Sequence, residues 1–569
     1  MVNQFMHSEF DKTHNEVNRA NFYRSPDLVM KLKRIGSFHQ SRLSFMRQLL
    51  RRVFTEKWHF NYRNWSLNSK GVGHIVYSVN TGKRTYSLVV FTHDIPPQER
   101  SDRVIATAWD LTFTLFNGVP NLKDIRRLEK QIPLQESGRM SENELVLGRA
   151  NRSVRLWELV VGKLASGVQP TENEIADVGY LMRTTAVYGS GKFGLADRVT
   201  IENFEEFKAP FQVELLAVYM LRTVVFDLVT WFAKLKGGNL AVDLDDRVKK
   251  TIGIGNSTGL GMAPFLVYHP ELLNKWISAR ERAFTEVLNL RNVSEGEFKI
   301  FKKLLSSSLD NLDGWTSVST DQLKRIEQLR KDLEGLMAFL SSFNRLQKHP
   351  WLRLFQWVEK NTSMETQELV VSLLLEPYAR FVDKLGPDMS VLGEKKFTKF
   401  QGMSCNDLLR LIKDNFSWAL EVDYSTQSQS ARFWYYSQAK LEPRLGERYK
   451  EVGSDLEEPL AIGRDVSSLY DHLLKGDCNT PISQFLLEQP KWRHIVKRVL
   501  STPMMPYGEI RDNLISKEMR PLDLLRCKLS FFGATNFDPR SDRWVRICMY
   551  QNAPLSGSDT SAYDDFWPY

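Results

Sequence analysis

The first clear pattern of hydrophobic and polar positions lies between residues 41 and 57. Apolar side chains recur there at helical spacing while arginines fall on the opposite side, and the apolar positions are Leu43, Met46, Leu50 and Val53. Ser41 is a candidate N-cap. The pattern predicts a basic amphipathic helix from Ser41 to Lys57.

The pattern changes after Gly73, where β-branched and aromatic residues gather in two short runs. The runs His74–Val79 and Tyr86–Phe91 are separated by Asn80–Lys83, which has the composition of a turn. These residues predict an antiparallel β-hairpin. A later alternating run, Arg543–Tyr550, predicts one more strand.

Helical patterns dominate the rest of the chain. Five capping-box sequences precede apolar residues at intervals of three and four: Ser141-x-x-Glu144, Thr171-x-x-Glu174, Ser294-x-x-Glu297, Ser319-x-x-Gln322 and Thr362-x-x-Glu365. The apolar stretch Phe211–Ala233 is long enough to cross a membrane, but charged residues interrupt it. We therefore expect a buried helix there.

These elements predict a predominantly α protein with a small antiparallel β element, which is an α+β fold class, multi-helical and with more than one domain. Changes of pattern suggest an N-terminal α+β region at 1–130, a helical region at 131–350 with a glycine-rich loop, a mostly helical region at 351–553 and a loosely ordered tail at 554–569. The stretch Glu442–Tyr449 lacks periodicity and predicts a boundary or a surface loop.

Composition places the chain among ordinary folded proteins, because 42% of its 569 residues are hydrophobic and 25% are charged. The four cysteines are scattered and no pair has Cys-x-x-Cys spacing, which argues against a disulfide framework and against a zinc or redox site. The first ten residues contain no apolar run of signal-peptide length. We therefore expect a cytoplasmic protein without a transmembrane segment.

The net charge of +9 is concentrated in one segment. Between Lys31 and Arg63 there are nine lysines and arginines and a single acidic residue, Glu56. Because this segment carries +8 of the total, the remainder of the chain is nearly neutral. Such a segment either binds nucleic acid or solvates and pairs with the protein's own surface.

The segment from Gly253 to Gly261 is the most distinctive local sequence. Its candidate ligand-binding residues are Gly253, Gly255, Asn256, Ser257, Thr258, Gly259 and Gly261. Glycines let backbone N–H groups approach a ligand closely, and such loops bind phosphate or carboxylate, more so when a helix follows. The spacing matches neither the dinucleotide-binding fingerprint nor the P-loop. An anion-binding loop and a tight turn between helices both fit it.

Three basic residues are candidate counter-charges for such an anion: Arg183, Lys192 and Arg222. The two arginines interrupt apolar stretches that we expect to be helical, and Lys192 lies in the glycine cluster that ends the first of them. A buried arginine needs a partner, because leaving its charge unpaired is costly. The partner is either a structural carboxylate or an anionic ligand, and we expect both arginines to face one cavity.

Histidine can act as a general acid or base near neutral pH, so the histidines are candidate catalytic residues. His269 lies close to the glycine-rich segment, and His93 with Asp94 directly follows the second strand of the predicted hairpin. A polar turn explains His93 and Asp94 equally well. No spacing of His, Cys or carboxylates suggests a metal site.

These residues favour a cytoplasmic enzyme that acts on an anionic small molecule bearing a phosphate, nucleotide or carboxylate group. The sequence does not specify the reaction type, the cofactor or the oligomeric state. Two alternatives remain. One is a nucleic-acid-binding protein that uses segment 31–63, although near-neutrality elsewhere disfavours it. The other is a helical interaction scaffold.

Overall fold

The fold is known from a computed structural model, which describes residues 22–100, 108–132, 141–176, 178–189, 192–193, 204–259, 265–315, 317, 319–389, 402–424, 433–437, 442–446, 462–511, 521–533, 536–539 and 544–558. Many helices accompany a mostly antiparallel sheet, which confirms the predicted α+β class. The chain forms two compact units. Unit 1 comprises Met1–His39, Leu260–Ser306 and Arg325–Ser530, and unit 2 comprises Gln40–Gly259, Ser307–Lys324 and Phe531–Tyr569.

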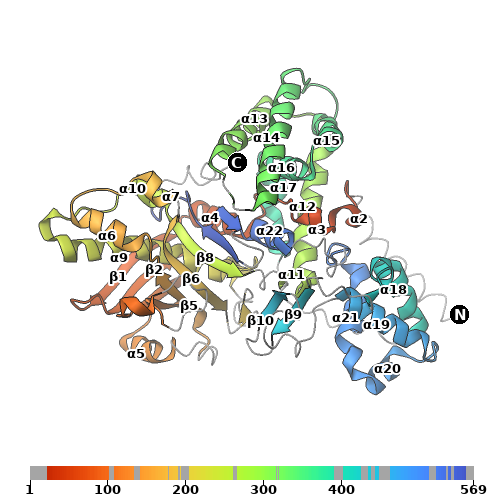
Figure 1. Ribbon diagram of the computed structural model, residues 1–569, viewed down its shortest axis with the longest axis horizontal. Helices are drawn as coiled ribbons and strands as arrows, with labels where there is room; N and C mark the ends of the chain where they lie inside the picture. The colour runs from red at the N-terminus through yellow and green to blue at the C-terminus, as the bar shows by residue number, and fades with distance from the viewer. Residues whose placement is uncertain are drawn as a thin grey trace. The chain divides into compact units, whose positions relative to one another are not determined.

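Unit 2 is built around a ten-stranded sheet, which is larger than the predicted hairpin (Figure 1). Its order is β1-β2-β3-β4-β5-β6-β8-β12-β11, and β7 pairs with β6. The strands are β1 His59–Leu67, β2 Gly73–Asn80, β3 Thr85–Thr92, β4 Leu111–Asn117, β5 Glu144–Arg152, β6 Tyr180–Gly189, β7 Lys192–Phe193, β8 Gly253–Gly259, β11 Asn536–Pro539 and β12 Trp544–Met549. Every pair is antiparallel except β6 with β8.

The hairpin and the late strand predicted from the sequence are both present. Strands β2 and β3 pair in register from Gly73 opposite Thr92 to Asn80 opposite Thr85, and Asn80 accepts a hydrogen bond from the N–H of Gly82 in the turn (2.7 Å). The late strand is β12. It pairs with β8 on one side and with β11 on the other.

Helices cover both faces of this sheet. Successive side chains of a strand point to opposite faces, so Val76 and Tyr77 of β2 identify the two sides. Val76 belongs to an apolar cluster with α5 (Leu122–Gln131), whereas Tyr77 donates a hydrogen bond to Asp227 of α9 (Gln212–Gly237). The other helices of unit 2 are α4 Phe45–Thr55, α6 Trp157–Ala165, α7 Glu172–Ala176 and α10 Asp246–Thr251.

Helix α9 is the buried helix that the sequence predicts. Among the described residues it is the one helix long and apolar enough to cross a membrane by length and composition, over Gln212–Leu240, and most of its apolar window is buried. Arg222, Glu214 and most apolar side chains of α9 are buried inside unit 2. It therefore forms the central helix of this unit's core.

The expectation that the apolar stretch around Arg183 is helical is wrong, because Arg183 lies in strand β6. The Thr171 capping box does begin a helix, α7, but α7 ends at Ala176 and the chain continues as strand β6. Gly179 has a left-handed φ of +72° and its N–H bonds to the carbonyl oxygen of Ile175 (2.7 Å). A glycine in this conformation terminates a helix, which frees the following residues to join the sheet.

The other capping boxes have mixed outcomes. Those at Ser294 and Ser319 begin α13 and α14, and α16 begins after Ser363, one residue later than expected. The Ser141 box is wrong, because it precedes strand β5 and not a helix. Its Ser141 and Glu144 side chains still meet (3.2 Å), while Glu144 also pairs with Arg127 of α5.

Unit 1 is mostly helical. The helices that lie wholly or mostly in it are α2 Pro26–Val29, α3 Leu32–Ile35, α11 Phe265–Tyr268, α12 Pro270–Leu288, α13 Glu295–Asn311, α14 Thr320–Ser341, α15 Pro350–Asn361, α16 Met364–Leu375, α17 Ala379–Val382, α18 Cys405–Leu420, α19 Ile462–Leu474, α20 Ile482–Glu488, α21 Arg493–Ser501 and α22 Pro521–Phe532. The irregular stretch expected from Glu442 is wrong in part, because β10 (Glu442–Gly446) pairs with β9 (Phe433–Ser437).

A network of buried charges lies in the core of unit 1. Glu368 of α16 accepts hydrogen bonds from Arg24 (2.6 Å), Arg280 (2.7 Å) and Arg34 (2.9 Å). Glu281 of α12 pairs with Arg24 and Arg280 as well. These contacts tie the N-terminal segment to α12 and α16, because each buried arginine finds its carboxylate on another element.

The predicted tail at 554–569 is described only at its start. The carbonyl oxygen of Pro554 accepts hydrogen bonds from Tyr219 (2.9 Å) and Arg222 (3.3 Å) of α9, so this residue is held by the core of unit 2. Residues 559–569 lie outside the described residues.

Candidate functional site

The parallel pair β6 and β8 gives the sheet of unit 2 a distinctive end. Arg183 and Thr184 of β6 lie level with Gly255 and Asn256 of β8, and the two strands run in the same direction to Gly189 and Gly259. Ligands of open sheets bind beyond the carboxyl ends of parallel strands, because the loops that leave those ends diverge around a crevice. This end is therefore the first place to look for a site.

Several predicted site residues meet at this end. Lys192 of β7 folds back to pair with Gly189, while Ser257, Thr258 and Gly259 form the last residues of β8. Gly261 lies outside the described residues. The register places Lys192 and the end of β8 at the same end of the sheet, although they are more than 60 positions apart in the chain.

Strand β12 brings a further basic residue that sequence reasoning missed. Trp544 lies opposite Gly259 and Arg546 lies opposite Ser257, while Asp538 of β11 is the other neighbour of Arg546. The alternating pattern of 543–550 predicts the strand itself. Its neighbour in the sheet could not be inferred, because β8 was expected to be a loop.

The expectation of a loop at Gly253–Gly259 is wrong, since this segment is strand β8. Two of its glycines allow close packing. A Cβ on Gly255 would lie 2.4 Å from the ring of Tyr180, and a Cβ on Gly253 would lie 2.3 Å from the carbonyl oxygen of Met549. These glycines are required by neighbouring protein atoms, which is a common reason for glycine within a strand.

Arg222 is occupied by the protein's own backbone. Its guanidinium is almost fully buried and donates to five carbonyl oxygens, those of Ile252, Ala553, Pro554, Lys249 and Lys250, at 2.8 to 3.3 Å. Burial lowers the pKa of Arg222 to about 10. The expectation that Arg222 pairs with a carboxylate or a ligand is therefore wrong, because carbonyl oxygens satisfy all its donors.

Arg183 lies within the sheet and not on a helix. It is buried on β6, level with Asn151 of β5 and Gly255 of β8, six residues before the strand ends. Arg222 donates to Ile252, which lies three residues before Gly255 in the chain. That both arginines face one cavity stays a prediction. A ligand-binding role for Arg183 stays a prediction.

His93 and Asp94 lie at the opposite end of the sheet from Gly259. They follow β3, whose last residue Thr92 pairs with Leu111 at the start of β4, and Leu111 in turn pairs with Ala150 near the end of β5. Strand β6 starts at that end. The paired residues run from Thr92 through Leu111, Ala150 and Thr184 to Asn256, and four strand spacings of about 4.8 Å put roughly 19 Å between β3 and β8. His93 and Asp94 therefore do not join the glycine-rich strand end.

His93 has protein partners of its own. Its Nε2 lies 3.0 Å from the hydroxyl of Thr112, and its N–H donates to the carbonyl oxygen of Asp110 (2.9 Å). The buried Asp110 carboxylate pairs with Arg100 (3.1 Å) and Arg152 (3.6 Å). Burial lowers the pKa of His93 below its usual value, although Asp110 opposes this shift. The geometry fits a neutral imidazole in a structural polar cluster.

This pKa shift predicts a stability change with pH. Because the folded state disfavours protonated His93, its contribution to the free energy of unfolding is fully retained above pH 6.5 and lost as the pH falls below that value. Urea denaturation at pH 7.5 and 5.5 measures the effect. We expect wild-type protein to lose more stability at pH 5.5 than His93→Gln does; equal losses would contradict the assignment.

His269 belongs to unit 1, where it is the residue before α12. Its carbonyl oxygen accepts a hydrogen bond from Leu273, and its N–H donates to Leu266, both at 3.1 Å. A catalytic role for His269 stays a prediction.

The arginines of the basic segment are mostly buried. Helix α4 confirms the predicted helix, but its N-cap residue is Ser44 and not Ser41. Arg47 and Arg51 are buried, so they do not form a solvated strip. Arg42 is buried as well, and Arg34 of unit 1 pairs with Glu368. Lys31, Lys33 and Lys57 are exposed, so part of the positive charge of this segment faces solvent. Nucleic-acid binding by segment 31–63 stays a prediction.

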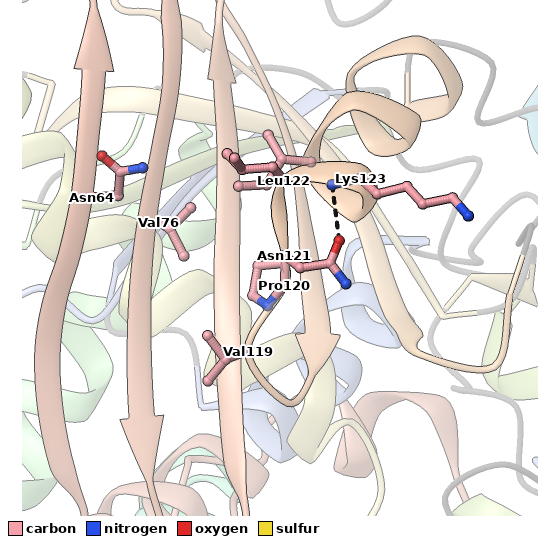
Figure 2. A pocket seen from close by; sticks show the side chains of 8 residues that line it. Asn64, Val76, Val119, Pro120, Asn121, Leu122 and Lys123 are labelled. Atoms are coloured by element: carbon pink, nitrogen blue, oxygen red, sulfur yellow. Dashed lines mark hydrogen bonds between the residues drawn. The ribbon is translucent and has the colours of Figure 1, made fainter.

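A groove of about 580 Å³ lies beside α5 on the sheet of unit 2 (Figure 2). Its lining is mostly apolar, with Val76 of β2 on one side and Val119, Pro120 and Leu122 on the other. The side chain of Lys123 is directed away from Val76, as Figure 2 shows. The N-cap Asn121 accepts hydrogen bonds from the N–H groups of Lys123 and Asp124, so these donors of the helix are already used. The groove therefore offers little to an anion.

Within the described part of the chain, no group of three or more His, Cys, Asp or Glu side chains is placed to hold a metal ion. Comparisons with models of known protein families, with curated proteins and with solved structures find no significant match to this chain.

Proposed function

We propose that the protein is an enzyme that acts on an anionic small molecule held at the carboxyl ends of β6 and β8. The observation that carries this proposal is the parallel pairing of these two strands, which brings two glycine-rich segments to one end of the sheet. Ligand sites form beyond such strand ends because the chain diverges there. The glycine-rich sequence continues past the last described residue of each strand, at Gly191 and Gly194 and at Gly261.

The chemistry at this end favours a phosphate, nucleotide or carboxylate group. Backbone N–H groups of glycine-rich segments form concave sites for anions. Lys192 pairs with Gly189 at the same end of the sheet, and the ammonium group of a lysine is a common binder of phosphate oxygens. Ser257 and Thr258 stand at the end of β8, and serine and threonine hydroxyls can donate hydrogen bonds.

A thermal-shift screen tests the proposal with four probes: ATP, acetyl-CoA, glucose 6-phosphate and citrate. We expect at least one to raise the melting temperature, because a ligand at about 100 times its Kd adds about 2.7 kcal/mol to the folded state. Lys192→Met and Gly259→Val are expected to reduce that shift. The matched control is Lys130→Met at an exposed position of α5, which removes the same charge elsewhere on unit 2.

Two outcomes would contradict the proposal. In the first, none of the four probes raises the melting temperature. In the second, Lys192→Met and Gly259→Val bind the probe as tightly as the wild-type protein and Lys130→Met do. Either result would favour the alternative of an interaction scaffold.

A further inference from the structure

Helices α20 (Ile482–Glu488) and α21 (Arg493–Ser501) of unit 1 are joined by a turn as short as that of a helix-turn-helix. Helix α20 ends at Glu488 and α21 begins at Arg493, so a turn of four residues joins them. The turn is a single 3-10 turn over Pro490–Trp492. Helix α21 packs against α18 and α19, which form the support behind it (Figure 1).

The turn is fixed by aromatic and apolar contacts. The ring of His472 on α19 lies 5.7 Å from that of Trp492 and 5.9 Å from that of Phe485 on α20, so one histidine holds both sides of the turn. On α21, Ile495, Val496 and Val499 are buried. The opposite side of α21 is thereby set toward solvent.

That exposed side is basic. Arg493, His494 and Lys497 are exposed on α21, and Lys491 is exposed in the turn. Among the described residues, no carboxylate forms an ion pair with Lys491, Arg493 or Lys497. Arg498, by contrast, is paired with Glu509 (2.9 Å). The exposed cations are therefore available to an external anion.

We propose that α20 and α21 bind duplex DNA, with the first turns of α21 in the major groove. The second helix of a helix-turn-helix enters this groove with its N-terminal residues foremost, and those residues are here Arg493, His494 and Lys497. Arginine and lysine recognise guanine edges and neutralise phosphates. Ser483, exposed on α20, supplies a further polar contact, whereas the amide of Gln484 donates to Glu488 of the same helix (2.9 Å). This surface is separate from segment 31–63 and from the strand-end site of unit 2.

Fluorescence anisotropy with the full chain and a labelled 20-bp duplex of mixed sequence tests the proposal. Neutralising three phosphates gives a slope of about −2.7 in log affinity against log salt, so affinity should fall about 40-fold between 50 and 200 mM salt. The double variant Arg493→Gln, Lys497→Gln should bind more weakly at 50 mM salt and reduce this slope by about 2.

The charge-matched control is Lys299→Gln, Lys302→Gln, which removes two exposed lysines from α13 of the same unit. It should bind DNA as wild type does, and the melting temperatures of both variants should match wild type. Equal weakening by the two double variants would overturn the proposal, because it would show a response to net charge alone. So would tighter binding of a 20-nucleotide single-stranded RNA, or no binding of the duplex at 50 mM salt.

Discussion

Glu368→Gln is expected to lower the free energy of unfolding by about 3–5 kcal/mol, since it breaks a buried ion-pair network on one side only. Glu368 touches Arg24, Arg280 and Arg34 and is itself fully buried. Without its charge, Arg24 and Arg280 would share Glu281 as their remaining carboxylate, and Arg34 would keep the side-chain oxygen of Gln367. Glutamine has nearly the same shape as glutamate, so the loss of stability would measure the effect of removing the negative charge of Glu368.

Urea denaturation followed by circular dichroism measures this loss. The control Glu327→Gln removes one carboxylate of the exposed pair with Lys331, and we expect it to leave the midpoint nearly unchanged. An equally small effect of Glu368→Gln would contradict the account.

The same network predicts a dependence on acid. Burial alone raises the pKa of Glu368, but Arg24, Arg280 and Arg34 outweigh this effect and hold it at about 2. The stabilisation by this carboxylate is therefore present above about pH 4.5 and is lost as the pH falls toward 2. The free energy of unfolding of Glu368→Gln should therefore fall less between pH 4.5 and pH 2 than that of the wild-type protein.

Gly255→Ala is expected to destabilise the protein by about 1–3 kcal/mol, the usual cost of overpacking a core. The added Cβ would lie 2.4 Å from the ring of Tyr180, which is itself buried. The matched control is Gly162→Ala in α6, where a Cβ meets nothing within 4 Å. Alanine should stabilise that helix by about 0.5–1 kcal/mol.

Thermal denaturation of Gly255→Ala and Gly162→Ala shows whether Gly255 is needed for packing against Tyr180 or for binding a ligand. A folding requirement predicts opposite signs for Gly255→Ala and Gly162→Ala. It also predicts partial recovery in the double variant Gly255→Ala, Tyr180→Leu, where the smaller side chain makes room. Unchanged stability of Gly255→Ala would instead support the interpretation that this glycine serves only a ligand.

Elements with a clear period could be predicted from the sequence. The long helix α14 shows one, because it buries Leu329, Leu333, Leu336 and Leu340 and exposes its other side. The hairpin of β2 and β3 could be predicted from its β-branched and aromatic residues and its turn, although both strands are buried on both faces. Strand β6 has neighbours on both edges, and its described residues Tyr180 to Thr184 are all buried. Without alternation, a buried strand resembles a buried helix.

Residues that are distant in the sequence explain why the glycine-rich segment forms a strand and not a loop. Glycines at 253 and 255 suggested a loop, but Tyr180 and Met549 explain them, and these lie about 75 and 300 positions away in the chain. Arg222 was correctly expected to need partners. Its partners are carbonyl oxygens of residues 249–252 and 553–554, and every residue has such an oxygen, so no sequence pattern could identify them.

Hydrogen–deuterium exchange tests the strand-end site most directly. The protein would be compared with and without the probe that gives the largest thermal shift. The account predicts that the probe slows exchange in peptides covering 186–193 and 254–261, and that Lys192→Met abolishes this protection. Protection confined to other segments, such as 74–94 beside His93, would contradict the placement of the site at the ends of β6 and β8.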